Sequence, residues 1–146
     1  MRELTRAEID DLLGTQTVGR LGLYDDERRR AYVVPVAHIY RDGAIYLHSA
    51  PGAKLRLAAR QARGICYEVD EVTGESQWKS AVAWGHFDEI RDPDQRRHVL
   101  ESFGSRLMRG PLRTRQNVGR GGMIGAGETV FRLVLDEVTG RCDGEA

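Results

Sequence analysis

The sequence is poor in the features that usually mark extracellular, membrane or nucleic-acid-binding proteins. Its two cysteines, Cys66 and Cys142, have neither metal-ligand spacing nor the density of a secreted disulfide scaffold. No apolar run approaches the ~20 residues of a transmembrane helix, and the charged N-terminus lacks the apolar core of a signal peptide. Lys plus Arg and Asp plus Glu are both 22, so the formal net charge is zero. We therefore expect free thiols, a cytoplasmic location, and neither nucleic acid nor a membrane as partner.

Motifs for nucleophilic and metal-dependent catalysis are also missing. No serine lies in a G-x-S-x-G elbow. The four histidines, His38, His48, His86 and His98, show neither H-x-x-x-H nor H-x-H spacing. By simple counting, His38 and His48 face each other across a hairpin, which leaves a metal pair open, although two residues on a half-exposed strand face are the simpler interpretation. We expect no metal site, so any chemistry would come from a bound cofactor that the protein positions.

Three helices are predicted from capping signals and apolar spacing. Their ranges are about 6–13, 53–62 and 93–104. Thr5 and Glu8 form a capping box at the start of the first helix. Asp92-Pro93 supplies an N-cap followed by proline at the first helical position of the third.

Six β-rich segments are predicted from alternation and from their β-branched and aromatic residues. Their ranges are 18–24, 31–40, 44–48, 65–69, 78–90 and 129–138. Residues 70–77 are polar and predict a turn, and Asp42-Gly43 predicts a hairpin. Hairpin spacing early and long alternating strands late favour a mostly antiparallel barrel with helices packed outside it. A single domain over residues 1–146 is expected at this length.

Irregularities are predicted at three places. Pro35 cannot donate to a sheet ladder, so its strand should have an edge or a bulge there. Gly85 predicts a bend or a close backbone approach within the long fifth strand. The glycine-rich residues 119–127 lack the strand before and the helix after that a phosphate loop requires, and are predicted to form a flexible loop.

Residues 43–60 predict an anion-binding elbow, because a strand, a Ser/Pro/Gly turn and a helix follow one another there. Backbone N–H groups at a helix start carry partial positive charge, to which Ser49 adds a hydroxyl donor and Lys54 a full charge. A phosphorylated ligand fits this arrangement. An ordinary strand-to-helix turn that binds nothing fits it as well, so the residues alone leave both interpretations open.

Several segments, in this order and at this spacing, resemble the pyridoxamine 5′-phosphate oxidase-like, FMN-binding split β-barrels. Within that family the chain looks most like the flavin-nucleotide-binding branch that includes the nitroimidazole-resistance reductases. The resemblance implies a six-stranded antiparallel split barrel, mostly β with flanking helices, and a homodimer with FMN at its interface. The segments that carry it are V-G-R-L-G-L, Y-V-V-P-V-A-H-I-Y-R-D-G, I-Y-L-H-S-A-P-G-A-K and W-K-S-A-V-A-W-G-H-F.

The resemblance also implies a set of cofactor contacts. One strand would lay its backbone along the flavin ring, the elbow would follow the ribityl chain and phosphate, and part of the long strand would approach from the other subunit. Our own hypothesis is that His48, in the elbow, is the catalytic side chain that helps with protons. In this order, the implied contacts are Val33, Val34, Pro35 and Val36; Leu47, His48, Ser49 and Lys54; and Lys79, Ser80 and Ala81.

The chain departs from true pyridoxamine phosphate oxidases. Those enzymes carry an Arg and a Lys in the ring-contacting strand where this chain has Tyr32 and Ala37, and Ser-Arg-Lys where it has Gly52-Ala53-Lys54. The resemblance therefore implies an FMN-dependent oxidoreductase, flavin reductase or nitroreductase-like, that acts on a small molecule with NAD(P)H as a candidate electron donor. A non-catalytic flavin or haem carrier and a deazaflavin-dependent reductase stay open as alternatives.

Overall fold

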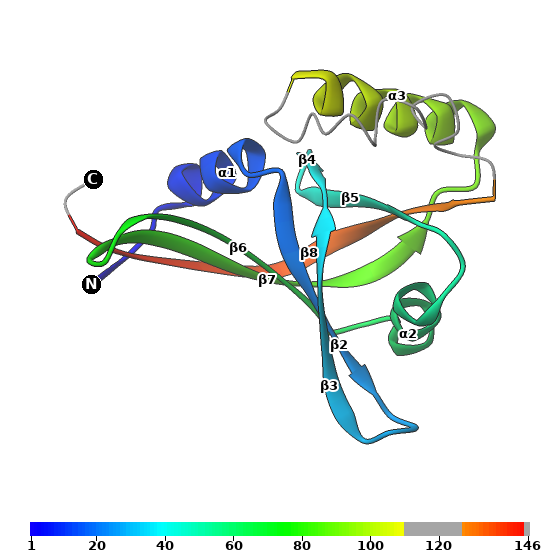
Figure 1. Cartoon of the computed structure of the whole chain (residues 1–146), viewed down its shortest axis with the longest axis horizontal. Coiled ribbons are helices and arrows are strands. Elements are labelled where there is room, and N and C mark those ends of the chain that lie inside the picture. Colours follow the sequence, from blue (N-terminus) through cyan, green and yellow to red (C-terminus); the bar gives the residue numbers. More distant parts are fainter. Residues whose placement is uncertain (110–126, 145–146) are drawn as a thin grey trace.

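The computed structural model describes residues 1–109 and 127–144, and an eight-stranded sheet forms its framework. Neighbouring strands are antiparallel in the order β3-β2-β6-β7-β8-β5-β4, and β1 pairs with β8. β6, β7 and β8 form a long ribbon, and the β2–β3 hairpin projects away from it (Figure 1). The strands are β1 (Arg2–Glu3), β2 (Val18–Asp25), β3 (Arg30–Ala37), β4 (Ile39–Arg41), β5 (Ala44–Ser49), β6 (Ile65–Gly74), β7 (Gln77–Glu89) and β8 (Thr129–Asp143).

The predicted fold class, mostly antiparallel β with flanking helices, is confirmed, but the strand count is eight rather than six. The two-residue β1 was not predicted, and the segment 31–40 divides at His38 into β3 and β4. The β6–β7 turn is also shorter than the predicted 70–77, because both strands continue to Gly74 and Gln77. These polar strand ends are held in the sheet by backbone hydrogen bonds between β6 and β7 and not by burial of their side chains. The alternation of apolar and polar residues that predicts a strand is therefore missing there.

The three predicted helices are present as α1 (Arg6–Thr15), α2 (Ala53–Gln61) and α3 (Pro93–Arg109). At α1, the Thr5 hydroxyl accepts the Glu8 N–H and the Glu8 carboxylate accepts the Thr5 N–H, which confirms the capping box. The Asp92 carboxylate accepts the Gln95 N–H at 2.9 Å, which confirms the cap of α3. The predicted end of α3 at Gly104 is wrong, since a glycine inside a helix costs only about 1 kcal/mol relative to alanine.

The special backbone positions behave as predicted. β3 is the edge strand of the sheet, so Pro35 needs no ladder partner on its open side. Gly85 lies at a register shift in β7, and a Cβ there would come within 2.5 Å of the Val134 carbonyl oxygen. Asp42 and Gly43 both have positive φ, as a tight hairpin turn requires.

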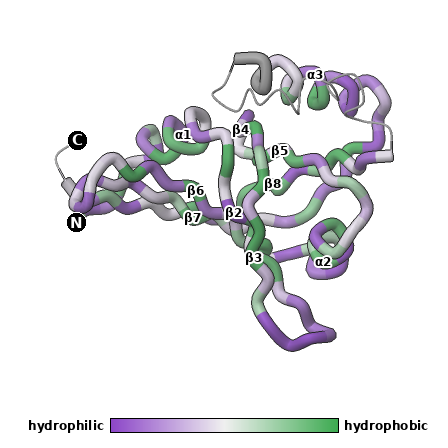
Figure 2. The backbone as a smooth tube through the Cα atoms, in the orientation of Figure 1, coloured by the Kyte–Doolittle hydropathy of each residue, from purple (hydrophilic) through white to green (hydrophobic). Residues whose placement is uncertain are grey.

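The main hydrophobic core lies on one face of the sheet, where α1 and α2 cover it. A smaller core packs α3 against the other face through Val99 and Phe103, which meet Ile39, Ile90 and Val130. In Figure 2 the apolar residues follow the strands, whereas the tip of the β2–β3 hairpin is hydrophilic. None of the helices among the described residues is long and apolar enough to cross a bilayer. Cys66 and Cys142 are both free thiols, as expected.

A buried polar seam joins α1, β3 and β6 at the break after β3. His38 is 1% exposed, and its Nε2 donates to the Leu13 carbonyl oxygen at 2.9 Å. The Tyr67 hydroxyl lies 2.7 Å from His38 Nδ1 and 3.2 Å from the Val36 carbonyl oxygen. In the β4–β5 hairpin Ile39 pairs with Tyr46, a register that puts His38 opposite Leu47 and not His48, so the predicted facing of His38 and His48 is wrong.

Candidate functional site

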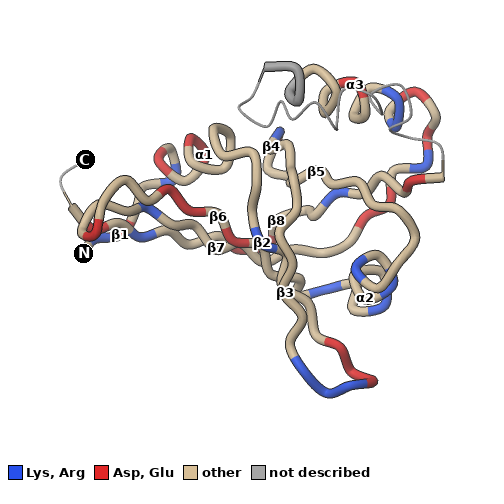
Figure 3. The backbone as a smooth tube through the Cα atoms, in the orientation of Figure 1, with Lys and Arg blue, Asp and Glu red and all other residues tan. Residues whose placement is uncertain are grey.

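The start of α2 differs from the starts of the other two helices. Its N-cap residue, Gly52, makes no side-chain capping hydrogen bond, and its first turn holds no acidic residue. α1 and α3 are both capped by side chains and both carry an acid in the first turn. Helix α2 instead carries Lys54, Arg56 and Arg60 and no acidic residue (Figure 3). Free N–H groups and this positive charge make the start of α2 suited to an anion.

Lys54 is half-buried at this helix start. Burial lowers the pKa of its ammonium group, and attraction to Glu128 opposes part of that effect. A cation that has already lost part of its hydration gains more from an anionic ligand than a fully solvated one does. Among the predicted phosphate contacts, Lys54 is therefore well placed.

Ser49, the other predicted donor of the elbow, is 6% exposed. Its hydroxyl donates to the Ala50 carbonyl oxygen at 2.8 Å. To reach a phosphate, this hydroxyl would have to give up that bond. Leu47 is 1% exposed and belongs to the core, which leaves its backbone as the part that a ligand could contact.

His48 is the predicted catalytic side chain. It contacts Glu128, the same carboxylate that attracts Lys54. Its Nδ1 is 2.9 Å from Glu128 Oε2. Its ring meets the edge of Phe103 from α3, with ring centroids 4.6 Å apart at 81°. Two groups therefore fix the ring, and neither was predicted, because Glu128 and Phe103 lie more than fifty residues away in sequence and no local pattern marks them.

The predicted ring-contacting strand, β3, presents alternate residues to its two faces. Val36 is buried in the core and Val34 packs against it. Val33 is 66% exposed, and Pro35 is exposed on the same outer face. The side chains of Val33 and Pro35 are thus the ones that a planar apolar ligand could cover.

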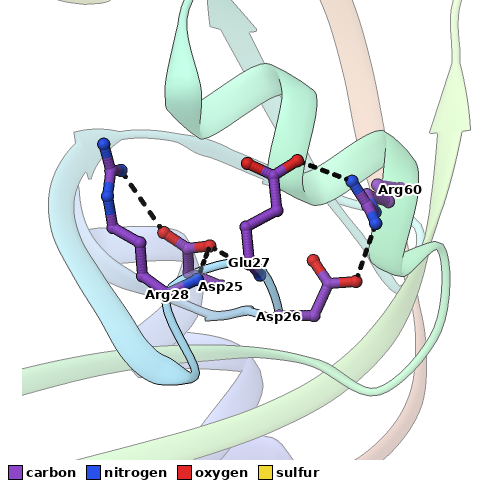
Figure 4. A network of polar contacts seen from close by, with 5 residues as sticks. All are labelled: Asp25, Asp26, Glu27, Arg28 and Arg60. Atoms are coloured by element: carbon purple, nitrogen blue, oxygen red, sulfur yellow. Dashed lines mark hydrogen bonds and ion pairs between the residues drawn. The ribbon is translucent and has the colours of Figure 1, made fainter.

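Exposed ion pairs tie the β2–β3 hairpin to α2 (Figure 4). Arg60 of α2 lies 2.9 Å from carboxylate oxygens of both Asp26 and Glu27. Asp25 closes the turn by accepting the N–H groups of Glu27 and Arg28. Exposed ion pairs contribute roughly 0–1 kcal/mol each, so these contacts add little to the packing of the hairpin against α2.

The predicted contacts on β7 lie far from the elbow within one chain. Ser49 of the elbow pairs with Thr129 at the start of β8, whereas Lys79 of β7 pairs with Cys142 near its end. The length of β8 between these two partners, and so between Ser49 and Lys79, is roughly 40 Å. In Figure 1 the β6–β7 tip and α2 lie at opposite ends of the sheet. These residues could share a ligand with the elbow only if they came from another copy of the chain.

The three β7 residues also divide between the two faces of the sheet. Ala81 is fully buried in the core. Lys79 lies on the same face, where it lines a cleft of about 400 Å³ together with Glu8 and Asp11 of α1. Ser80 is on the outer face, which is also the face of Val33.

The described residues contain no group of three or more His, Cys, Asp or Glu side chains that could hold a metal ion. Of the glycine-rich stretch 119–127, all but Gly127 falls outside the described residues, so the predicted loop stays a prediction.

Comparison with known protein families identifies the family of this chain. A sequence model of the pyridoxamine 5′-phosphate oxidase family matches residues 5–142. The chain belongs to this family. The resemblance and the split-barrel class that it implied are thereby confirmed.

Solved structures agree with this assignment. A FAD-binding protein from Mesorhizobium loti is 28% identical, with 98% of each chain covered and a TM-score of 0.78. A putative 5-nitroimidazole antibiotic resistance protein from Bacteroides thetaiotaomicron is 21% identical, with a TM-score of 0.71, covering 95% of this chain and 85% of that one. An FAD and haem binding protein from Mycobacterium smegmatis is 18% identical, with a TM-score of 0.70, covering 99% and 75%. The last two likenesses concern the fold alone.

Proposed function

We propose that this protein is a flavin-dependent oxidoreductase that binds FMN, or the FMN half of FAD, between the elbow before α2 and the outer face of β3. The observation that carries the proposal is the uncapped start of α2 with the half-buried Lys54 beside it. Membership of the pyridoxamine 5′-phosphate oxidase family and the 28% identity to a FAD-binding protein support a flavin as the phosphorylated ligand.

Each part of the candidate site has a role in this proposal. The free N–H groups of α2 and the Lys54 ammonium hold the phosphate. Val33 and Pro35 offer an exposed apolar surface to the ring. His48 Nε2 gives or takes the proton that accompanies electron transfer. When bound, the flavin supplies the redox chemistry.

The substrate that we propose is a small electron acceptor of the nitroaromatic or quinone class, with NAD(P)H as the electron donor. Two-electron reduction takes up two protons, which turn a quinone into a hydroquinone, or turn a nitro group into a nitroso group with release of water. NAD(P)H supplies the two electrons and one of these protons. The second proton comes from water, and His48 Nε2 would take it up and pass it to the oxygen of the acceptor.

We further propose that two copies associate through the outer face of β3, β2, β6 and β7. No helix among the described residues packs there, and it carries Val33 and Val72, both 66% exposed, together with Trp78, Val82 and Trp84. Aromatic residues and arginine are enriched at protein–protein interfaces. Arg20 lies on the same face, 2.6 Å from Asp70. In such a dimer, Ser80 of one copy could approach the ring bound by the other.

The test is a fluorescence titration of the purified protein with riboflavin, FMN and FAD. Lys54→Met should weaken FMN and FAD binding by about 1–3 kcal/mol, which is roughly 5- to 150-fold, because it removes a charge-assisted contact to the phosphate. Riboflavin has no phosphate, so its affinity should not change. Arg56→Met is the matched control, since residue 56 lies about 200° around the helix from residue 54.

Two results would contradict the proposal. A protein that is colourless as purified and takes up none of the three flavins does not have this function. Equal weakening of FMN and riboflavin by Lys54→Met would place the phosphate elsewhere. Reduction of the bound flavin by NAD(P)H without turnover of any acceptor would favour a carrier, and a Soret band would favour haem.

A further inference from the structure

Glu128 precedes β8 and has no assigned role, yet its carboxylate contacts the one histidine in the candidate site. We propose that Glu128 is a positioning residue that fixes His48 in the Nδ1–H tautomer and turns Nε2 toward the bound ligand. The tautomer follows from the chain alone. Only the identity of the ligand that Nε2 faces rests on the proposed function.

The tautomer follows from the 2.9 Å contact between His48 Nδ1 and Glu128 Oε2. An ionised carboxylate oxygen can only accept a hydrogen bond, so the proton must be on Nδ1. In the neutral ring, Nε2 then carries the lone pair. The hydrogen bond made by one ring nitrogen of a histidine sets the state of the other.

Nε2 is free to meet a ligand. Among the described residues it has no hydrogen-bond partner, and no buried side-chain nitrogen or oxygen there lacks one, so Nε2 is accessible. The edge-on packing of the ring against Phe103 limits its rotation. Among the described residues, the His48 ring is therefore held in one orientation with Nε2 as its unpaired polar atom.

The backbone of Glu128 is fixed by contacts with α3 and with β5. Its carbonyl oxygen accepts a hydrogen bond from Arg96 of α3. The next residue, Thr129, pairs with Ser49 at the end of β5. Lys54 adds an attraction to the carboxylate, so one acid links the predicted proton carrier to the predicted phosphate contact.

The experiment is ¹⁵N NMR of the histidine rings in the flavin-free protein, in the wild type and in Glu128→Ala and Glu128→Gln. In the wild type, we expect His48 Nδ1 to be protonated and Nε2 not. Glu128→Ala should move His48 to a mixture of tautomers. Glu128→Gln should preserve the Nδ1–H form, because the amide oxygen still accepts the hydrogen bond.

The chain provides a matched control in His86, whose Nδ1 lies 3.1 Å from Asp136 on the exposed β7–β8 pair. Asp136→Ala should change the His86 signals and leave those of His48 unchanged. Addition of FMN should then shift His48 Nε2 and not His86. In turnover assays, Glu128→Ala should lower kcat by about 10- to 100-fold with little change in KM, and Glu128→Gln should restore most of the rate.

A wild-type His48 protonated at Nε2, or a tautomer that does not respond to Glu128→Ala, overturns the inference whether or not flavin binds. The expected tautomer response in a protein that binds no flavin supports the positioning role and contradicts the proposed function. A fall in kcat that matches a loss of thermal stability, without the tautomer change, would make Glu128 merely structural.

Discussion

Gly19 of β2 provides a sharp test of the buried seam. A Cβ at this position would lie 2.4 Å from Tyr67 Cε1, 2.5 Å from Tyr67 Cζ and 2.6 Å from the Glu68 carbonyl oxygen. Real Cβ atoms do not approach so closely, and the Glu68 backbone cannot give way without breaking the sheet. Gly19→Ala must therefore push the Tyr67 ring out of its place.

The cost follows from what Tyr67 does there. Overpacking a core by one methyl group costs about 1–3 kcal/mol. Moving the ring also breaks the contact of its hydroxyl with buried His38 and with the Val36 carbonyl oxygen, and a buried polar group left unpaired costs about 1–3 kcal/mol. We expect Gly19→Ala to lower the free energy of unfolding by about 2–5 kcal/mol, or the melting temperature by roughly 10 °C.

The matched control is Gly104→Ala in α3, where a Cβ would meet nothing within 4 Å. It should raise the free energy of unfolding by about 0.5–1 kcal/mol, because alanine is the better helix former. The assay is urea denaturation of both variants at one protein concentration, which keeps any dimer contribution constant. If the free energy of unfolding of Gly19→Ala lay within about 0.5 kcal/mol of the wild-type value, the close packing of Tyr67 against Gly19 and His38 would be refuted.

Two further outcomes are expected. Hydrogen bonds from Arg2 and from the Thr5 N–H lower the pKa of Glu8 from 4.5 to about 2. The contribution of Glu8 to stability is therefore complete above about pH 4.5 and is lost as the pH falls through about 2. The difference in urea midpoint between the wild type and Glu8→Gln should shrink over that range. Light scattering should give about twice the 16.4 kDa chain mass, and Trp84→Glu on the outer face should shift it to the mass of one chain. The equally charged variant Gln77→Glu, at the exposed first residue of β7, should leave the mass unchanged.

Local signals located most of the elements. The capping box at Thr5 and Glu8 and the turn at Asp42-Gly43 each satisfy backbone groups within a few residues, so their chemistry is visible in the sequence. Pro35 and Gly85 were predicted for similar reasons, since each alters the backbone at its own position. Signals of this kind do not depend on the rest of the fold.

The errors arose where distant segments meet. Polar residues at the ends of β6 and β7 are strand because each pairs with the other and, in β7, with β8. α3 runs past Gly104 because tertiary packing of Phe103 outweighs a small helix penalty. His38 was predicted to face His48, yet it is drawn inward by Leu13 and Tyr67.

The sequence by itself determined most of the elements, the family and the strand-to-helix elbow with Lys54, because capping, turn chemistry and strand alternation act over a few residues. Only the tertiary structure decided which side chains share the site. It separated Lys79 from the elbow by roughly 40 Å of strand, placed Val33 outward and Val36 inward, and brought Glu128 to His48 across 80 residues. Those outcomes depend on the register and the sheet order, which no short stretch of the chain encodes.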